Sequence, residues 1–182
     1  MRVLWILFAG AAWAATPAES AQQKIDSILQ NRAKPGSVVI FTQTEANAWA
    51  HAKLPTLIPQ GVRNEYLDFG TDVITGAALV DIPKIRRSLG KEPGMVLSRM
   101  FEGERPAKAT VRALSRSGSV TLSVTRLELG NAVASGAVLD LLLESVVRQI
   151  YPGAKINEPI ALDYRIDSIK VAPKELRVSI KK

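Results

Sequence analysis

The chain has 182 residues, of which 47% are hydrophobic and 23% charged, and this balance indicates one soluble domain with a substantial core. It contains no cysteine, which excludes disulfides and thiolate metal sites. Its formal net charge of +7 favours anionic partners such as phospholipid headgroups or glycopolymers, whereas the scattered basic residues and only 5% aromatics fit nucleic acid poorly.

The first 14 residues have the layout of a secretory signal peptide. Arg2 precedes an apolar run from Val3 to Phe8, and small residues lead to an A-x-A site that ends at Ala14. The apolar run is too short to cross ~30 Å of hydrocarbon. We therefore predict cleavage after Ala14 and a single exported domain over residues 15–182, in the periplasm or outside the cell. Because no cysteine follows the site, a lipoprotein is not expected.

Two helices and a short strand are predicted in the N-terminal part. Residues 17–34 carry apolar side chains at helical spacing, and Pro35-Gly36 stops this amphipathic helix. The apolar stretch "SVVIF" then predicts a strand. Thr42 and Glu45 have the spacing of a capping box, which begins a second helix that Pro55 is expected to end.

Antiparallel strands are predicted from Gly61 onward. "VRNEYLDFG" and "TDVITGAALVDIP" form one expected hairpin, and residues 107–129 form another around Ser117-Gly118. Between them lies a basic segment over residues 83–103, predicted as one or two helices broken at Gly90 and Pro93-Gly94. Two last strands are expected, one with Ile160, Leu162, Tyr164 and Ile166 on one face, the other with Leu176, Val178 and Ile180.

The stretch "SGAVLDLLLESVVRQIYPG", residues 135–153, is the most apolar part of the domain. Asp140, Glu144 and Arg148 form a charged ridge on a helical projection, and each charge would cost ~2.5–3.5 kcal/mol at mid-bilayer. We therefore predict a buried helix and not a membrane span. The expected fold class is α+β, with a bent antiparallel sheet of about six strands packed on this long C-terminal-half helix and N-terminal amphipathic helices beside it.

The sequence has no recognisable catalytic or metal-binding motif, and neither a cofactor nor a metal is expected. His51 is the single histidine, has no visible nucleophile, and is interpreted as a surface or packing residue. Asp163 and Asp167 flank Arg165 and are the only candidate carboxylate pair for a hydrolase of envelope polymer. Alternating charges along a strand are more typical of a solvated face.

Lipid or membrane binding is the leading functional interpretation, because basic residues lie next to flexible apolar ones. The predicted acyl-chain contacts are Met95, Leu97, Met100, Phe101, Leu139, Leu142, Leu143 and Val146. The predicted contacts to anionic headgroups are Lys84, Arg86, Arg87 and Lys91.

The order of elements, with "FTQTEANAWAHAKLP" after an apolar strand and "TLSVTRLELGNAVASGAVLDLLLESVV" late in the chain, resembles small bacterial extracytoplasmic domains related to the tubular lipid-binding proteins. Glu45 and Asn47 match the helix start of that pattern. The resemblance implies a bent sheet that wraps a helix, a groove for lipid chains and no catalysis. We therefore expect a non-enzymatic exported module that binds lipid or a membrane surface. The alternatives are an envelope assembly factor with a protein partner and, less favoured, a hydrolase.

Overall fold

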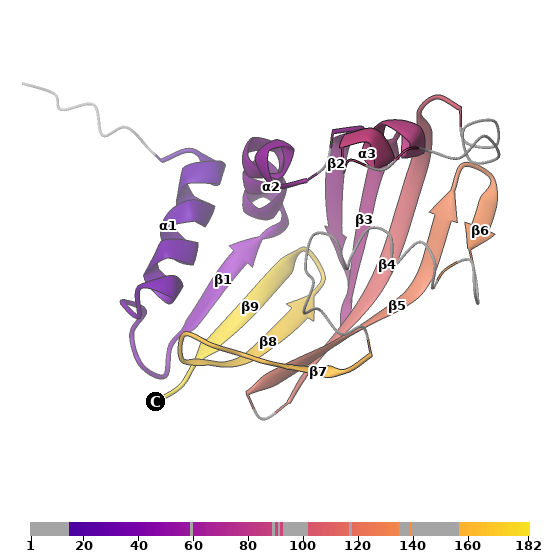
Figure 1. Ribbon diagram of the computed structural model, residues 1–182. Coiled ribbons are helices and arrows are strands. Elements are labelled where there is room, and N and C mark those ends of the chain that lie inside the picture. Colours follow the sequence, from indigo (N-terminus) through magenta and orange to yellow (C-terminus); the bar gives the residue numbers. More distant parts are fainter. Residues whose placement is uncertain are drawn as a thin grey trace, which may run out of the picture.

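Figure 1 shows the computed structural model, in which two antiparallel sheets lie side by side. The structure describes residues 15–58, 60–88, 90, 92, 102–116, 118–134, 139 and 157–182. In chain order the elements are α1 (Pro17–Leu29), β1 (Val38–Thr42), α2 (Gln43–Leu57), β2 (Val62–Phe69), β3 (Val73–Val80), α3 (Ile82–Ser88), β4 (Arg105–Arg116), β5 (Ser119–Leu129), β6 (Ala132–Ala134), β7 (Pro159–Ala161), β8 (Ile166–Ala172) and β9 (Glu175–Ile180).

Helix α1 begins with a complete capping box. Thr16 Oγ1 accepts a hydrogen bond from the backbone N–H of Glu19, and the Glu19 carboxylate accepts one from the backbone N–H of Thr16. Pro17 occupies the first turn, where its missing N–H leaves no helical hydrogen bond unmade. The apolar side of the helix buries Ala21 and Ile28. The helix predicted over residues 17–34 is therefore confirmed, although it ends at Leu29.

Replacing Thr16 with alanine removes this cap, and we expect it to lower the free energy of unfolding by about 1 kcal/mol. Chemical denaturation of the variant and the wild type measures the difference. Thr56→Ala is a suitable comparison, because the Thr56 hydroxyl donates to the Lys53 carbonyl near the end of a helix and caps no N-terminus. An equal loss in the two variants would contradict the capping role of Thr16.

The smaller sheet has the strand order β1-β9-β8. Register places Val39 opposite Val178 and Phe41 opposite Leu176, so apolar side chains coincide on one face. Phe41, Val178 and Ile180 on this face form a core cluster with Ala21 and Ile28 of α1. The predicted alternation of Leu176, Val178 and Ile180 is thus confirmed.

The larger sheet has the order β2-β3-β4-β5-β6, and β7 also pairs with β5. Both predicted hairpins are present, β2 with β3 and β4 with β5. A second core cluster of Phe69, Ala113 and Val171 joins this sheet to β8 of the smaller one. Backbone hydrogen bonds link the sheets directly: Asp72 N–H donates to Val171 O at 3.1 Å, and Lys174 N–H donates to Phe69 O at 3.0 Å.

Helix α2 protects the outer edge of β2 through two side-chain amides. Asn47 Nδ2 donates to Leu67 O and Asn47 Oδ1 accepts from Leu67 N, both at 2.7 Å. One turn earlier, Gln43 Oε1 accepts from Phe69 N at 3.2 Å. Two helix residues four positions apart are separated by nearly the same distance as two strand residues two positions apart. The two amides can therefore make the hydrogen bonds to the edge of β2 that a neighbouring strand would otherwise make. This arrangement covers an edge that would otherwise invite pairing with another chain.

Glu45 joins α2 to α1. Its carboxylate completes the predicted capping box with Thr42, which is confirmed, and also accepts hydrogen bonds from Lys24 Nζ at 2.5 Å and Ser20 Oγ at 2.6 Å. The residue is only 8% exposed. Burial by itself would raise the pKa of Glu45, but the hydrogen bonds from Lys24, Ser20 and Thr42 outweigh burial and lower it to about 2.

The predicted fold class is wrong in its architecture. The chain forms two antiparallel sheets instead of one, and the helices that cover the described core are the N-terminal α1 and α2. After Ser88 the described residues include no long helix. The reason for the error is that β9 pairs with β1 from the other end of the chain and β8 joins this pair through β9, a partnership that no local pattern specifies. The predicted helix over residues 135–150 lies outside the described residues, except for Leu139.

Two local predictions also need correction. The expected strand through Ile160, Leu162, Tyr164 and Ile166 is interrupted, because Tyr164 and Arg165 both have positive φ and form a turn between β7 and β8. Helix α2 does not end at Pro55 but continues to Leu57. Its last turn closes around the proline, since Ile58 N–H still donates to Leu54 O at 2.9 Å.

Candidate functional site

The inner face of the larger sheet has a trough that follows from cross-strand register. On one row across four strands, Leu67 lies opposite Gly76, Gly76 opposite Ala109, and Ala109 opposite Leu127. Two large side chains therefore flank two very small ones. The neighbouring pair Ala78 and Ala107 continues the floor. Since successive strand residues alternate between faces, these small side chains all lie on one side of the sheet.

The C-terminal end of α2 forms one wall of this trough, and together they enclose an apolar groove of about 270 Å³. The residues that line it are Leu54, Ile58, Val62, Glu65, Tyr66, Leu67, Gly76, Ala77, Ala78, Ala107, Lys108, Ala109 and Leu127. A Cβ atom added at Gly76 would meet a single neighbour within 4 Å, Leu67 Cδ2 at 3.9 Å. No other described residue therefore packs on the floor at Gly76.

One carboxylate interrupts the apolar lining. Glu65 lies at the bulge of β2, where the register with β3 shifts between Arg63 and Tyr66, and it is half-buried. Within the part of the chain that the structure describes, its side chain has no hydrogen bond or ion pair. The groove thus combines an extended apolar surface with three polar side chains, those of Glu65, Tyr66 and Lys108, and a few polar groups in an apolar lining are typical of sites that orient a bound ligand.

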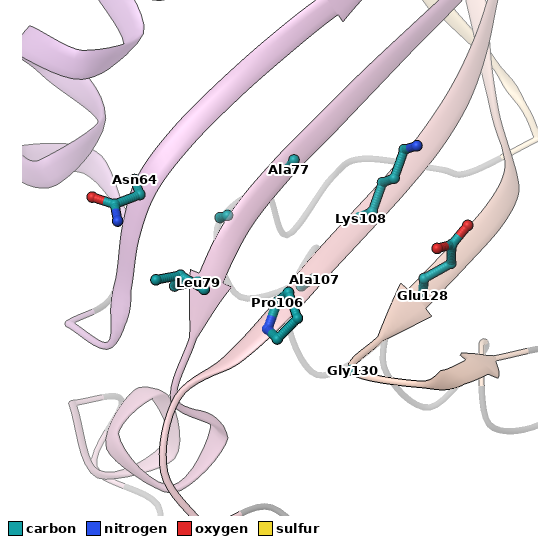
Figure 2. Close-up of a pocket in the computed structure, with 9 residues that line it drawn as sticks. Asn64, Ala77, Leu79, Pro106, Ala107, Lys108, Glu128 and Gly130 are labelled. Atoms are coloured by element: carbon teal, nitrogen blue, oxygen red, sulfur yellow. The ribbon is translucent and has the colours of Figure 1, made fainter.

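The same sheet has a second hollow of about 340 Å³ (Figure 2), which shares Ala77, Ala78, Ala107 and Lys108 with the lining of the groove. Figure 2 shows Lys108 and Glu128 projecting from neighbouring strands beside this hollow, with Asn64 and Leu79 at its other side. Lys108 lies opposite Glu128 in the register. A hydrogen bond from Arg126 and, more weakly, the charge of Lys108 hold the pKa of the Glu128 carboxyl below its ordinary value.

The basic residues predicted to contact headgroups are partly described. Lys84, Arg86 and Arg87 lie on α3, where Lys84 and Arg87 are exposed and Arg86 is half-buried. Helix α3 packs tightly on the loop before β2: a Cβ at Gly61, whose φ is +108°, would come within 2.9 Å of Asp81 O. The pKa of the Glu104 carboxyl is lowered, chiefly by its hydrogen bond from Arg63 and to a smaller extent by the charge of Lys84. None of the three residues lines the apolar groove.

The predicted acyl-chain contacts mostly lie outside the described residues. This holds for Met95, Leu97, Met100, Phe101, Leu142, Leu143 and Val146, and for the predicted headgroup contact Lys91. Leu139 is described and half-buried. The groove instead involves Gly76, Ala78, Ala107 and Ala109, which sequence reasoning missed, because their small size matters only once β3 and β4 pair in this register.

The other sequence candidates do not form a catalytic arrangement in the structure. His51 is exposed on α2, as predicted for a surface residue. Asp163 and Asp167 are not on one strand: Asp163 precedes the Tyr164-Arg165 turn, and Asp167 belongs to β8. Among the described residues there is no group of three or more histidine, aspartate or glutamate side chains that would hold a metal ion.

The fold and the groove define this chain as an α+β protein with two antiparallel sheets and an open apolar trough on the larger one. The sequence matches no protein-family model, and no curated protein matches it either. Within the described part of the chain, no helix is long and apolar enough to cross a bilayer.

Proposed function

We propose that this protein binds the acyl chain of a lipid or another single-chain amphiphile in the groove between α2 and the larger sheet. The observation that carries the proposal is the open floor of Gly76, Ala78, Ala107 and Ala109 between the larger side chains Leu67 and Leu127. The side chains of the described residues leave this apolar trough unfilled, and covering it with an apolar ligand contributes about 0.8 kcal/mol for each buried methylene.

The size of the groove narrows the class of ligand. At about 270 Å³ it lies just below the range of roughly 300–1,000 Å³ in which drug-sized ligands bind, so one acyl segment fits and a complete two-chain phospholipid does not. Glu65 gives the groove a polar side toward which a headgroup can turn. From the groove and the predicted signal peptide together, we propose that this chain is a non-enzymatic, exported lipid-binding protein of the bacterial envelope.

The test measures binding of fatty acids and alkyl alcohols of increasing length to the purified protein by calorimetry. Affinity should rise about fourfold with each added methylene until the groove is filled. Ala78→Leu and Ala109→Leu, which place a larger side chain in the trough, should weaken binding at least about tenfold.

Ala132→Leu is the matched control. Ala132 is an exposed alanine on β6 of the same sheet and is not among the residues that line the groove, so the same added volume falls outside the trough. It should leave affinity unchanged. Affinity that does not depend on chain length, or equal affinity in Ala78→Leu and the wild type, would rule out this groove as the acyl site.

A further inference from the structure

The outer face of β4 has a row of basic side chains. Lys108, Arg112 and Arg116 are four residues apart and exposed, and they lie on the same face as Thr110 and Leu114. Four residues of a strand span about 13 Å, which exceeds the Debye length of ~8 Å at physiological ionic strength. The three charges therefore repel one another weakly and form an extended cationic surface at little cost to stability.

The carboxylates of this face offset the row only in part: Glu128 lies opposite Lys108 and interacts with its charge, but other cations bind this carboxylate and its neighbours directly. Arg126 pairs with Glu128, Lys174 with Asp68, and at the edge Arg63 with Glu104. Register places Val73 and Ser123 opposite Arg112, and Ser119 opposite Arg116. In the part of the chain that the structure describes, the side chains of Lys108, Arg112 and Arg116 make no hydrogen bond or ion pair.

An apolar side chain lies within the row. Leu114, between Arg112 and Arg116, is 52% exposed on the surface of a central strand. A soluble, hydrophilic polyanion would gain nothing from contact with this leucine. A phospholipid surface offers both parts of the complement, phosphate groups for the cations and an apolar layer just beneath them for a projecting leucine.

We propose that the outer face of β4 docks on an anionic phospholipid bilayer, with Lys108, Arg112 and Arg116 at the headgroups and Leu114 inserted between them. The inference does not depend on the acyl groove, since of these four residues only Lys108 also lines that groove. Each basic residue near an anionic surface strengthens membrane partitioning about fivefold, so the three together account for about a hundredfold.

The experiment measures sedimentation of the full chain with vesicles of equal parts phosphatidylglycerol and phosphatidylcholine, and with vesicles of phosphatidylcholine alone. The wild type should partition to the anionic vesicles, and binding should fall steeply as salt is raised. The triple variant Lys108→Gln, Arg112→Gln, Arg116→Gln should lose about a hundredfold in partitioning. A control that removes the same charge elsewhere, Lys34→Gln, Lys170→Gln, Lys182→Gln, changes exposed lysines and should keep most of the binding.

Leu114→Trp reports on the site itself. Its tryptophan emission should shift to the blue on anionic vesicles by more than that of the wild type, since position 114 would enter the interface. Four results would overturn the proposal: equal binding to both kinds of vesicle, unchanged binding of the triple variant, an equal loss in the control variant, or capture by soluble dextran sulfate without any binding to vesicles. Circular dichroism of each variant verifies that a loss of binding is not a loss of fold.

Discussion

Replacing Glu45 with glutamine should lower the free energy of unfolding at neutral pH by about 3 kcal/mol. The wild-type carboxylate is buried and accepts hydrogen bonds from Lys24, Ser20 and Thr42. Glutamine has a similar shape but no charge, so the Lys24 ammonium loses its ion-pair partner at the contact between α1 and α2. Hydrogen bonds to charged groups contribute about 1.5–3 kcal/mol each, so this contact is among the most stabilising in the domain.

The effect should depend on pH in a defined direction. The pKa of Glu45 falls from 4.5 to about 2 on folding, so the folded state holds its proton less tightly than the unfolded state. The stabilisation is therefore complete above pH 4.5, declines as pH falls from 4.5 toward 2, and is absent below that. Urea denaturation across this window should show a smaller loss of stability in Glu45→Gln than in the wild type.

The capping box of α1 supplies the control. Glu19 has the same relation to Thr16 that Glu45 has to Thr42, and its pKa is lowered chiefly by the Thr16 backbone. It is exposed, however, and in the described structure its carboxylate accepts hydrogen bonds only from Thr16. Glu19→Gln should change stability much less. If the two variants lose the same amount, or if Lys24→Gln and Glu45→Gln prove additive, the contact between α1 and α2 is not the source of the effect.

Asn47→Ala should destabilise the protein by about 2–4 kcal/mol. The Asn47 amide satisfies both Leu67 N and Leu67 O, and its Nδ2 also donates to Gln43 O at 2.9 Å. Truncation leaves half-buried backbone groups without partners, at a cost of about 1–3 kcal/mol each. The edge of β2 would also be uncovered, so we expect concentration-dependent self-association by light scattering.

Asn47→Asp tests the hydrogen-bond donor of the Asn47 amide separately from its acceptor. Aspartate keeps an oxygen for Leu67 N–H but directs a second oxygen at the carbonyls of Gln43 and Leu67, so a loss at least as large as that of alanine is expected at neutral pH. Lys53→Ala, an exposed position on the same helix, should change stability by less than about 0.5 kcal/mol. A wild-type-like melting temperature and monomeric state for Asn47→Ala would refute the edge-capping role.

Parts of the fold were accessible from local patterns. The Thr42–Glu45 capping box and the β4–β5 hairpin at Gly118 were predicted and are confirmed, because each depends on residues within a few positions of one another. The architecture was not accessible. Strand alternation shows which residues share a face of a strand, but β1 pairing with β9, some 140 residues away, is decided by which apolar faces match across the folded chain.

The candidate site, too, was only partly predictable from local sequence patterns. Basic and apolar residues drew attention to residues 84–101 and 135–150, whereas the groove comes from small residues with no chemistry of their own. Gly76 and Ala109 become a trough only when register places them between Leu67 and Leu127. Likewise, Glu45 and Asn47 were recognised as a helix-start pattern, but their bonds to Lys24 and Leu67 required the packed structure.

By itself the amino-acid sequence determined the charge of the chain, its lack of thiol chemistry, the starts of its helices and the faces of most strands, since these depend on composition and on neighbours along the chain. Only the tertiary structure decided that the described strands divide into two sheets, that small side chains gather into a groove, and that Lys108, Arg112 and Arg116 of β4 form no ion pair with the other described residues. These features arise between residues that are distant in sequence, where the free energy of contact depends on the partner and not on the local pattern.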